Sequence, residues 1–129
     1  MSERNEQNKI LIIEDNSILR DLLRSWLNEL MPDCDIYLTS NGEDGLEQMK
    51  ILKPDIVVVD IKLPGIDGLE VTRIIKNNLD KTEVIVLTIY EGVNYKNDAY
   101  AAGAALFINK REMHLKLPGA IQSILSAKK

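Results

Sequence analysis

The sequence predicts an α/β fold in which a parallel sheet carries helices on both faces. Short apolar runs rich in branched residues occur at residues 10–13, 56–59 and 84–87. Such runs are typical of strands that are buried on both sides of a parallel sheet. Between them, apolar residues recur every three or four positions, which is the period of an amphipathic helix. The alternation of the two patterns favours a doubly wound sheet.

The first strand, residues 10–13, is followed by a helix that Asn16 or Ser17 can cap and that ends at residues 31–33. Its apolar residues predict one core-facing stripe, and they are Ile18, Leu19, Leu22, Leu23, Trp26, Leu27 and Leu30. Residues 35–39 are half polar, as expected of a strand near a sheet edge.

The second half of the chain continues the alternation. Residues 41–53 form a helix that Pro54 stops, and it is followed by the strand of residues 56–59 and a helix over residues 67–77. A strand over residues 83–88, a helix over residues 91–102 ended by Gly103, and a strand over residues 104–108 come next.

Pro118 limits the last helix, because proline is tolerated in a first turn and not in a helix interior. We therefore expect this helix to begin near Leu115 or later. Its core face consists of Ala120, Ile121, Ile124 and Leu125. The result is five strands and five helices, with the flavodoxin-like strand order 2-1-3-4-5 as the favoured arrangement.

Length, charge and hydropathy make several classes of protein improbable for this sequence. The 129 residues suffice for one domain, residues 9–129, preceded by a polar, disordered tail over residues 1–8. A formal net charge of −4 without a basic stripe argues against nucleic-acid binding. No apolar run has the length of a signal peptide core or a membrane span, and Cys34 is the single cysteine. We therefore expect a cytoplasmic protein that does not bind membranes.

Carboxylates follow two of the buried strands. Glu14 and Asp15 end the first, and Asp60 ends the third. In the predicted strand order these three meet at the switch point, where open α/β sheets bind ligands, with Thr88 and Lys110 at the ends of neighbouring strands. An alternative is that Asp60 only stops its strand, since Asp is common in turns.

Three clustered carboxylates need a cation or a proton, because two charges ~4 Å apart repel by about 4 kcal/mol at an effective dielectric near 20. Oxygen ligands of this kind suit Mg²⁺. A carboxylate beside Mg²⁺ can attack phosphorus to give an acyl phosphate, with Lys110 supplying charge and Thr88 a hydroxyl hydrogen bond.

As a set, these residues resemble the receiver domain of bacterial response regulators over residues 9–126. The matching features are Glu14-Asp15, Asp60 with Pro64-Gly65, Leu87-Thr88, and Phe107 three residues before Lys110. The resemblance implies that Asp60 accepts a phosphoryl group from a sensor histidine kinase or phosphotransfer protein. It also implies that Asp15, Asp60 and the backbone carbonyl of Lys62 bind Mg²⁺, with Glu14 acting through a water.

The resemblance further implies a two-state switch. Thr88 and Lys110 would turn towards the phosphoryl group and Phe107 would move inward, which changes a face around residues 91–125. That face would control a partner protein or an output domain, and the chain could form a homodimer on phosphorylation. Such a protein is not an enzyme beyond catalysing its own phosphorylation and dephosphorylation.

The sequence departs from the commonest family pattern near the site. Ile89 is bulky where a small residue is usual and narrows access, and Lys62 and Tyr90 occupy positions that tune dephosphorylation in the family. Arg111 replaces a frequent proline, so we expect a trans bond before it.

Three other functions fit the sequence less well. An aspartyl-phosphate phosphatase is disfavoured, because Lys62 stands where such enzymes have a second acid. A flavin-binding protein of the same fold is a weaker alternative, because the acids after the first strand would repel a phosphate. A degenerate receiver that binds a partner without phosphorylation is the third.

Overall fold

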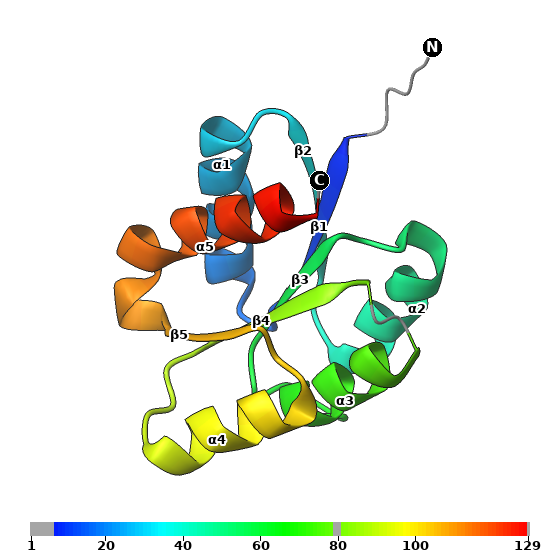
Figure 1. Ribbon diagram of the computed structural model, residues 1–129, viewed down its shortest axis with the longest axis vertical. Helices are drawn as coiled ribbons and strands as arrows, with labels where there is room; N and C mark the ends of the chain where they lie inside the picture. Colours follow the sequence, from blue (N-terminus) through cyan, green and yellow to red (C-terminus); the bar gives the residue numbers. More distant parts are fainter. Residues whose placement is uncertain (1–6, 79–80, 129) are drawn as a thin grey trace.

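The computed structural model describes residues 7–78 and 81–128 (Figure 1). Within them, strands and helices alternate throughout. The elements in chain order are β1 (Asn8–Ile13), α1 (Ser17–Leu30), β2 (Cys34–Thr39), α2 (Gly42–Leu52), β3 (Ile56–Val59), α3 (Gly68–Asn78), β4 (Glu83–Thr88), α4 (Val93–Ala102), β5 (Leu106–Asn109), the 3₁₀ turn η1 (Lys110–Glu112) and α5 (Met113–Ala127).

The five strands form one parallel sheet in the order β2-β1-β3-β4-β5. The predicted flavodoxin-like order 2-1-3-4-5 is therefore confirmed, including the edge position of β2. The register aligns Ile13 of β1 with Val59 of β3 and Val59 with Val86 of β4. Since these strands are parallel and their carboxyl ends differ by no more than two residues in this register, the residues that follow them emerge along one edge of the sheet.

Side chains of the central strands alternate between two apolar layers, as the period of two in a strand requires. Ile10, Ile12 and Val58 pack towards one layer, which α1 and α5 cover. Leu11 and Val57 pack towards the other, which α2, α3 and α4 cover. Figure 1 shows this division of the helices between the two faces of the sheet. Burial on both faces explains why the β3 sequence is apolar without interruption.

The predicted stripe of α1 is broader than the face that the helix buries. Leu23 and Leu27 are buried, and Leu19 and Trp26 pack against the same cluster. In contrast, Ile18, Leu22 and Leu30 are 80%, 55% and 47% exposed. Each helical residue is turned by about 100° from the one before it, so Ile18 and Leu22 point away from the sheet although Leu19 and Leu23 point towards it.

The prediction that the last helix begins near Leu115 or later is wrong. The helix α5 begins at Met113, and Pro118 lies inside it. Proline there removes the hydrogen bond to the carbonyl of His114, which is an exposed residue near the helix start. Fully buried Leu117 and Ile121 hold the helix on the sheet on either side of this position. The predicted core face is otherwise confirmed, because Ala120, Ile124 and Leu125 pack against the same cluster.

Two expectations concern the chain outside these layers. The strand β1 begins at Asn8, the last residue of the predicted tail, and residues 1–6 of that tail lie outside the described residues. Among the described helices, none is long and apolar enough to cross a membrane.

Cys34, at the start of β2, is a partly buried free thiol.

Candidate functional site

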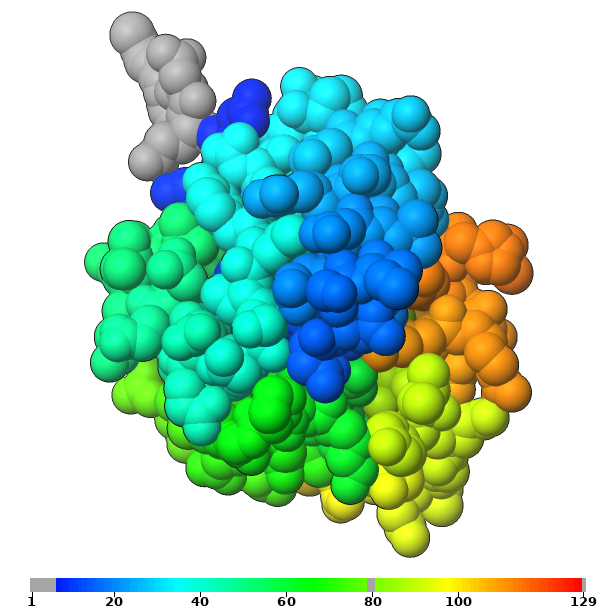
Figure 2. All heavy atoms as spheres, turned by 180° about the vertical axis from the view of Figure 1, so that it is seen from behind, coloured from blue at the N-terminus to red at the C-terminus, as the bar shows by residue number. Residues whose placement is uncertain are grey.

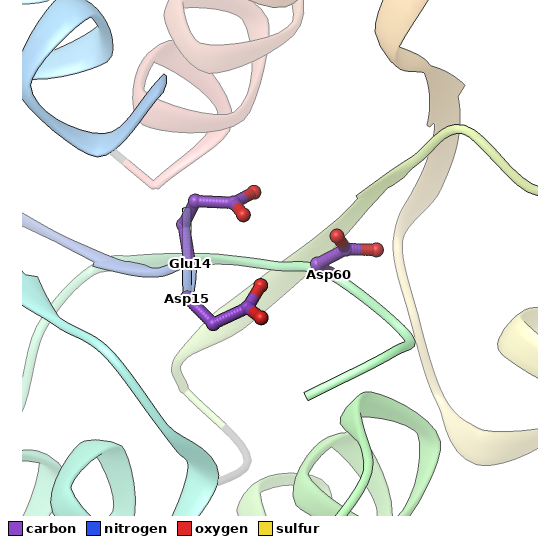
Figure 3. A group of neighbouring side chains, drawn as sticks. All are labelled: Glu14, Asp15 and Asp60. Carbon is purple, nitrogen blue, oxygen red and sulfur yellow. The ribbon is translucent and has the colours of Figure 1, made fainter. Parts of the chain in front are cut away.

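Three carboxylates meet where β1 and β3 end. Glu14 and Asp15 follow β1, and Asp60 follows β3. The backbone N–H of Asp60 donates to the carbonyl of Ile13 at 3.3 Å, which joins the two strand ends. One carboxylate oxygen from each acid lies within 4.8 Å of the others. Figure 3 shows the three side chains converging from the two strands.

Burial differs among the three acids. Glu14 is 3% exposed and Asp60 is 6% exposed, whereas Asp15 is exposed. Within the described residues, Asp60 Oδ1 is buried and has no hydrogen-bond partner. A buried carboxylate oxygen without a partner is costly, and a hard divalent cation would satisfy it. The cluster therefore has the ligands of a site that could bind a metal ion.

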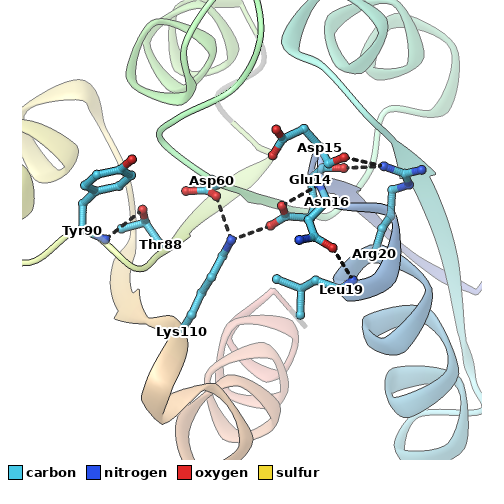
Figure 4. Close-up of polar contacts among 9 residues, drawn as sticks. All are labelled: Glu14, Asp15, Asn16, Leu19, Arg20, Asp60, Thr88, Tyr90 and Lys110. Carbon is cyan, nitrogen blue, oxygen red and sulfur yellow. Dashed lines mark hydrogen bonds and ion pairs between the residues drawn. The ribbon is translucent and has the colours of Figure 1, made fainter.

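Lys110 supplies a cation to the two buried acids. Its Nζ lies 2.8 Å from Glu14 Oε1 and 2.8 Å from Asp60 Oδ2, and its side chain is 13% exposed (Figure 4). Burial lowers the pKa of Lys110, but hydrogen bonds to the two carboxylates outweigh this and hold the pKa above its usual value. Lys110 is therefore charged at neutral pH.

Glu14 shows the opposite balance. Burial raises the pKa of its carboxyl group, and the contact with Lys110 and a hydrogen bond from the backbone N–H of Asn16 only partly offset that rise. The ionised form of Glu14 is thus less stable in the folded protein than in water. The site holds its negative charge at an energetic cost that a further cation would reduce.

Thr88 ends β4 beside this cluster and is fully buried. Its hydroxyl oxygen accepts a hydrogen bond from the backbone N–H of Tyr90 at 3.3 Å. Figure 4 shows Thr88 and the ammonium group of Lys110 next to Asp60. The hydroxyl therefore occupies the neighbourhood of the acids while being held by the loop that leads to α4.

The residues expected to tune the site lie in the segments that follow Asp60 and Thr88. The Nζ of Lys62 lies 5.4 Å from the centre of the Tyr90 ring, and that ring lies 5.5 Å from the ring of Tyr95 on α4. A cation at this distance from an aromatic face is attracted to it. The side chain of Ile89 is 61% exposed.

Phe107 and Arg111 connect the site to the β5 side of the molecule. Phe107 is partly buried and packs against the layer that α4 covers, and its backbone N–H donates to the hydroxyl of Tyr100 at 3.3 Å. Arg111 forms an ion pair of 2.6 Å with Glu91 across the two loops. The described peptide bonds are all trans, which confirms the expectation for Arg111.

Two residues of the site were not predicted from sequence. A Cβ at Gly68 would lie 1.9 Å from the backbone oxygen of Asp60, so this glycine lets α3 approach the acid directly. Arg20 Nη1 donates to the carbonyl oxygen of Glu14 at 2.8 Å. Neither role has a local sequence signal, because both depend on how separate segments meet.

In Figure 2 the starts of α1 (blue), α3 (green), α4 (yellow-green) and α5 (orange) surround the same part of the surface. The helices begin there because each follows a strand that ends at this edge of the sheet. The segments that lead into these four helices therefore lie at the edge of the sheet that carries Glu14, Asp15 and Asp60.

Comparison with known proteins gives a consistent result. A family model described as "Response regulator receiver domain" matches residues 10–122. The response regulator GacA of Pseudomonas aeruginosa is 30% identical over 125 residues, which cover 94% of this chain and 56% of that protein. The chain therefore spans about half the length of the curated relatives it matches.

Solved structures agree in fold. The signal receiver domain of a DNA-binding response regulator (merR) from Colwellia psychrerythraea superposes with a TM-score of 0.88 at 27% identity, covering 93% of this chain and 99% of that one. The BeF3-activated DrrB receiver domain gives a TM-score of 0.84 at 25% identity, covering 94% and 99%. The acidic cluster, the sheet order and the family match together show that this chain belongs to the response regulator receiver domain family.

Proposed function

We propose that this chain is a phosphorylation-activated signalling switch that accepts a phosphoryl group on Asp60. The observation that carries the proposal is the state of the Asp60 carboxylate. It is buried beside two other acids, its Oδ2 is held by Lys110, and its Oδ1 has no partner among the described residues. Buried carboxylate oxygens are normally hydrogen-bonded, so an unsatisfied one favours a functional role over a purely structural one.

The phosphoryl donor would be a phosphohistidine on a sensor kinase or phosphotransfer protein. One oxygen of Asp60 attacks phosphorus, the P–N bond breaks, and the donor imidazole leaves with the electron pair of that bond. Lys110 remains close enough to balance the negative charge that gathers on the transferring oxygens. A carboxylate oxygen can attack phosphorus directly, so the step calls for no general base on this chain.

Asp15, Asp60 and the backbone carbonyl of Lys62 would bind Mg²⁺, and Glu14 would act through a water. When bound, Mg²⁺ would neutralise the clustered carboxylates and the phosphoryl oxygens. The exposure of Asp15 supports a direct role in metal binding, since its carboxylate is open to solvent while Glu14 is already engaged by Lys110.

The response to phosphorylation would pass through Thr88 and Phe107. If the Thr88 hydroxyl turns to the phosphoryl group, the backbone N–H of Tyr90 loses its acceptor and the start of the β4–α4 loop is released. Phe107 would then move into the space that Thr88 leaves. Its backbone N–H is bonded to Tyr100, so this motion also pulls on α4. Phosphorylation thus supplies the differential free energy for a two-state change.

The face around residues 91–125 would carry the signal to a partner protein or an output domain, and phosphorylation could drive homodimerisation through it. α4 suits this role, because Ala99 and Ala102 are its only buried residues and it lacks a side-chain N-cap. A helix that buries so little apolar surface is easily displaced. We place the protein in the cytoplasm, in agreement with its single free thiol.

Intact mass measured after incubation with acetyl phosphate tests the proposal. The chain should gain one phosphoryl group with Mg²⁺ and none without it, and Asp60→Asn should abolish the gain. Asp98→Asn, at an exposed position on α4, is the matched control and should behave as the native chain does. If no condition yields the gain, the chain is a degenerate receiver that binds its partner constitutively. Rapid, continuing release of phosphate would indicate a phosphatase.

A further inference from the structure

Arg20 contacts the backbone of both acids that follow β1. It lies on α1, and its side chain turns back towards the turn between β1 and α1 (Figure 4). Its Nη1 donates to the carbonyl oxygen of Glu14 at 2.8 Å and to that of Asp15 at 3.4 Å. A single half-buried guanidinium group therefore spans the two consecutive peptide carbonyls of the acid pair.

The other contacts of this turn hold different atoms. The backbone N–H of Asn16 donates to Glu14 Oε2 at 3.0 Å, and the side chain of Asn16 caps α1 by accepting from Leu19 at 3.0 Å. These bonds fix the side chain of Glu14 and the start of the helix. The side chain of Asp15 is exposed, and the contact of Arg20 with this residue is to its main-chain carbonyl.

We infer that Arg20 is a positioning residue for the cation site. By holding the carbonyls of Glu14 and Asp15, it keeps the Asp15 carboxylate within the cluster that it forms with Asp60. Arg20 does not bind the metal ion itself, and it acts through the main chain. This inference rests on the proposed function, because it assumes that the acidic cluster binds Mg²⁺.

Charge and geometry predict opposite effects of removing Arg20. A guanidinium group beside the acids repels a second cation, so the loss of its charge alone would strengthen Mg²⁺ binding. The loss of its hydrogen bonds would instead let the turn relax and weaken Mg²⁺ binding. Partners in the outer shell of a metal site typically change affinity by 10-fold to 100-fold. We expect geometry to dominate, with affinity falling about tenfold.

Calorimetric titration of the full chain with Mg²⁺ alone tests this expectation. Arg20→Met keeps the apolar stem and removes the donor, so it should weaken binding about tenfold. Arg20→Lys offers an ammonium group in place of Nη1 and should restore most of the affinity. Arg24→Met removes the same charge one helical turn further on, at an exposed position, and should leave affinity unchanged.

Unchanged or tighter binding by Arg20→Met would overturn the inference, as would an equal loss in Arg24→Met. If Arg20→Met does not fold by circular dichroism, Arg20→Gln is judged by the same criterion. Phosphorylation by acetyl phosphate gives a second readout: Arg20→Met should need more Mg²⁺ for half-maximal rate but reach the native maximal rate. If Mg²⁺ affinity falls as expected while Asp60 never gains a phosphoryl group, the proposed function fails and the role of Arg20 stands.

Discussion

Replacing Lys110 with methionine should destabilise the metal-free protein and make it depend on Mg²⁺. Methionine keeps most of the apolar length of lysine but removes the ammonium group that lies 2.8 Å from both Glu14 and Asp60. Two buried carboxylates would then face each other without a compensating cation. Breaking a buried ion pair by removing one partner typically costs 3–5 kcal/mol, that is, about 4 kcal/mol.

Two estimates bound the loss of unfolding free energy expected for Lys110→Met. At the 4.8 Å bound on the separation of the acid oxygens, the repulsion between two charges is about 3.5 kcal/mol at an effective dielectric of 20. The protein can avoid that repulsion by protonating Glu14, whose ordinary pKa is 4.5. At pH 7 this protonation costs at most about 3.4 kcal/mol, from 1.36 kcal/mol for each pH unit. Both limits indicate a loss of about 3 kcal/mol.

Urea unfolding in EDTA and in Mg²⁺ measures this effect. Lys110→Met should lose about 3 kcal/mol in EDTA and recover most of it in Mg²⁺, because a bound ion stabilises by about 2.7 kcal/mol at 100 times its dissociation constant. Lys116→Met is the control, since exposed Lys116 pairs with exposed Glu112 one helical turn away. A loss below about 1 kcal/mol in EDTA, or equal Mg²⁺ stabilisation of variant and native chain, would refute the view that Lys110 serves as the internal cation.

Two further predictions concern the same site. Because burial raises the pKa of Glu14, the folded state holds its proton more tightly than the unfolded state, and the contribution of Glu14 to stability falls as pH rises through the window above 4.5. Metal-free Glu14→Gln should therefore be more stable than the native chain at pH 7, by a margin that shrinks towards pH 4.5; a margin independent of pH in urea unfolding would contradict this. Lys62→Ala and Tyr90→Ala should each shorten the phosphoryl half-life several-fold, because losing either side chain of the Lys62–Tyr90 contact would give water easier access to a phosphoryl group on Asp60. The control is Lys96→Ala, at an exposed position on α4. If its half-life, measured by intact mass, equals those of Lys62→Ala and Tyr90→Ala, these two residues do not slow dephosphorylation.

The sequence predicted the sheet well because burial on both faces leaves a strong pattern. The run from Ile56 to Val59 has no polar interruption, and in the structure each of its residues is buried. Acids placed directly after such runs can be located without knowing any distance, since parallel strands end at a common edge. Glu14, Asp15 and Asp60 were brought together correctly on this basis alone.

The wrong predictions concern residues whose apolar or cyclic side chain does not by itself determine where it points or where a helix begins. Ile18 and Leu22 have the spacing of a core stripe, but they are turned away from the sheet by one residue's rotation. The expectation that Pro118 delays the start of the last helix is wrong, because the packing of Leu117 and Ile121 outweighs the loss of one hydrogen bond near an exposed helix start. Arg20 and Gly68 could not be predicted, because their roles follow from main-chain contacts between separate segments.

Lys110 connects the charge of the Asp60 carboxylate to the position of the segment that follows β5. Without a metal ion or phosphoryl group, Lys110 balances Glu14 and Asp60 and ties the start of the β5–α5 segment to the ends of β1 and β3. A phosphoryl group on Asp60 would give Lys110 a stronger partner than either carboxylate, and would draw Thr88 away from the loop that it now holds. Both β4 and β5 would then change their contacts at the same edge of the sheet. In the proposed mechanism, the buried charge at this edge would let one covalent event act on α4, which buries only Ala99 and Ala102.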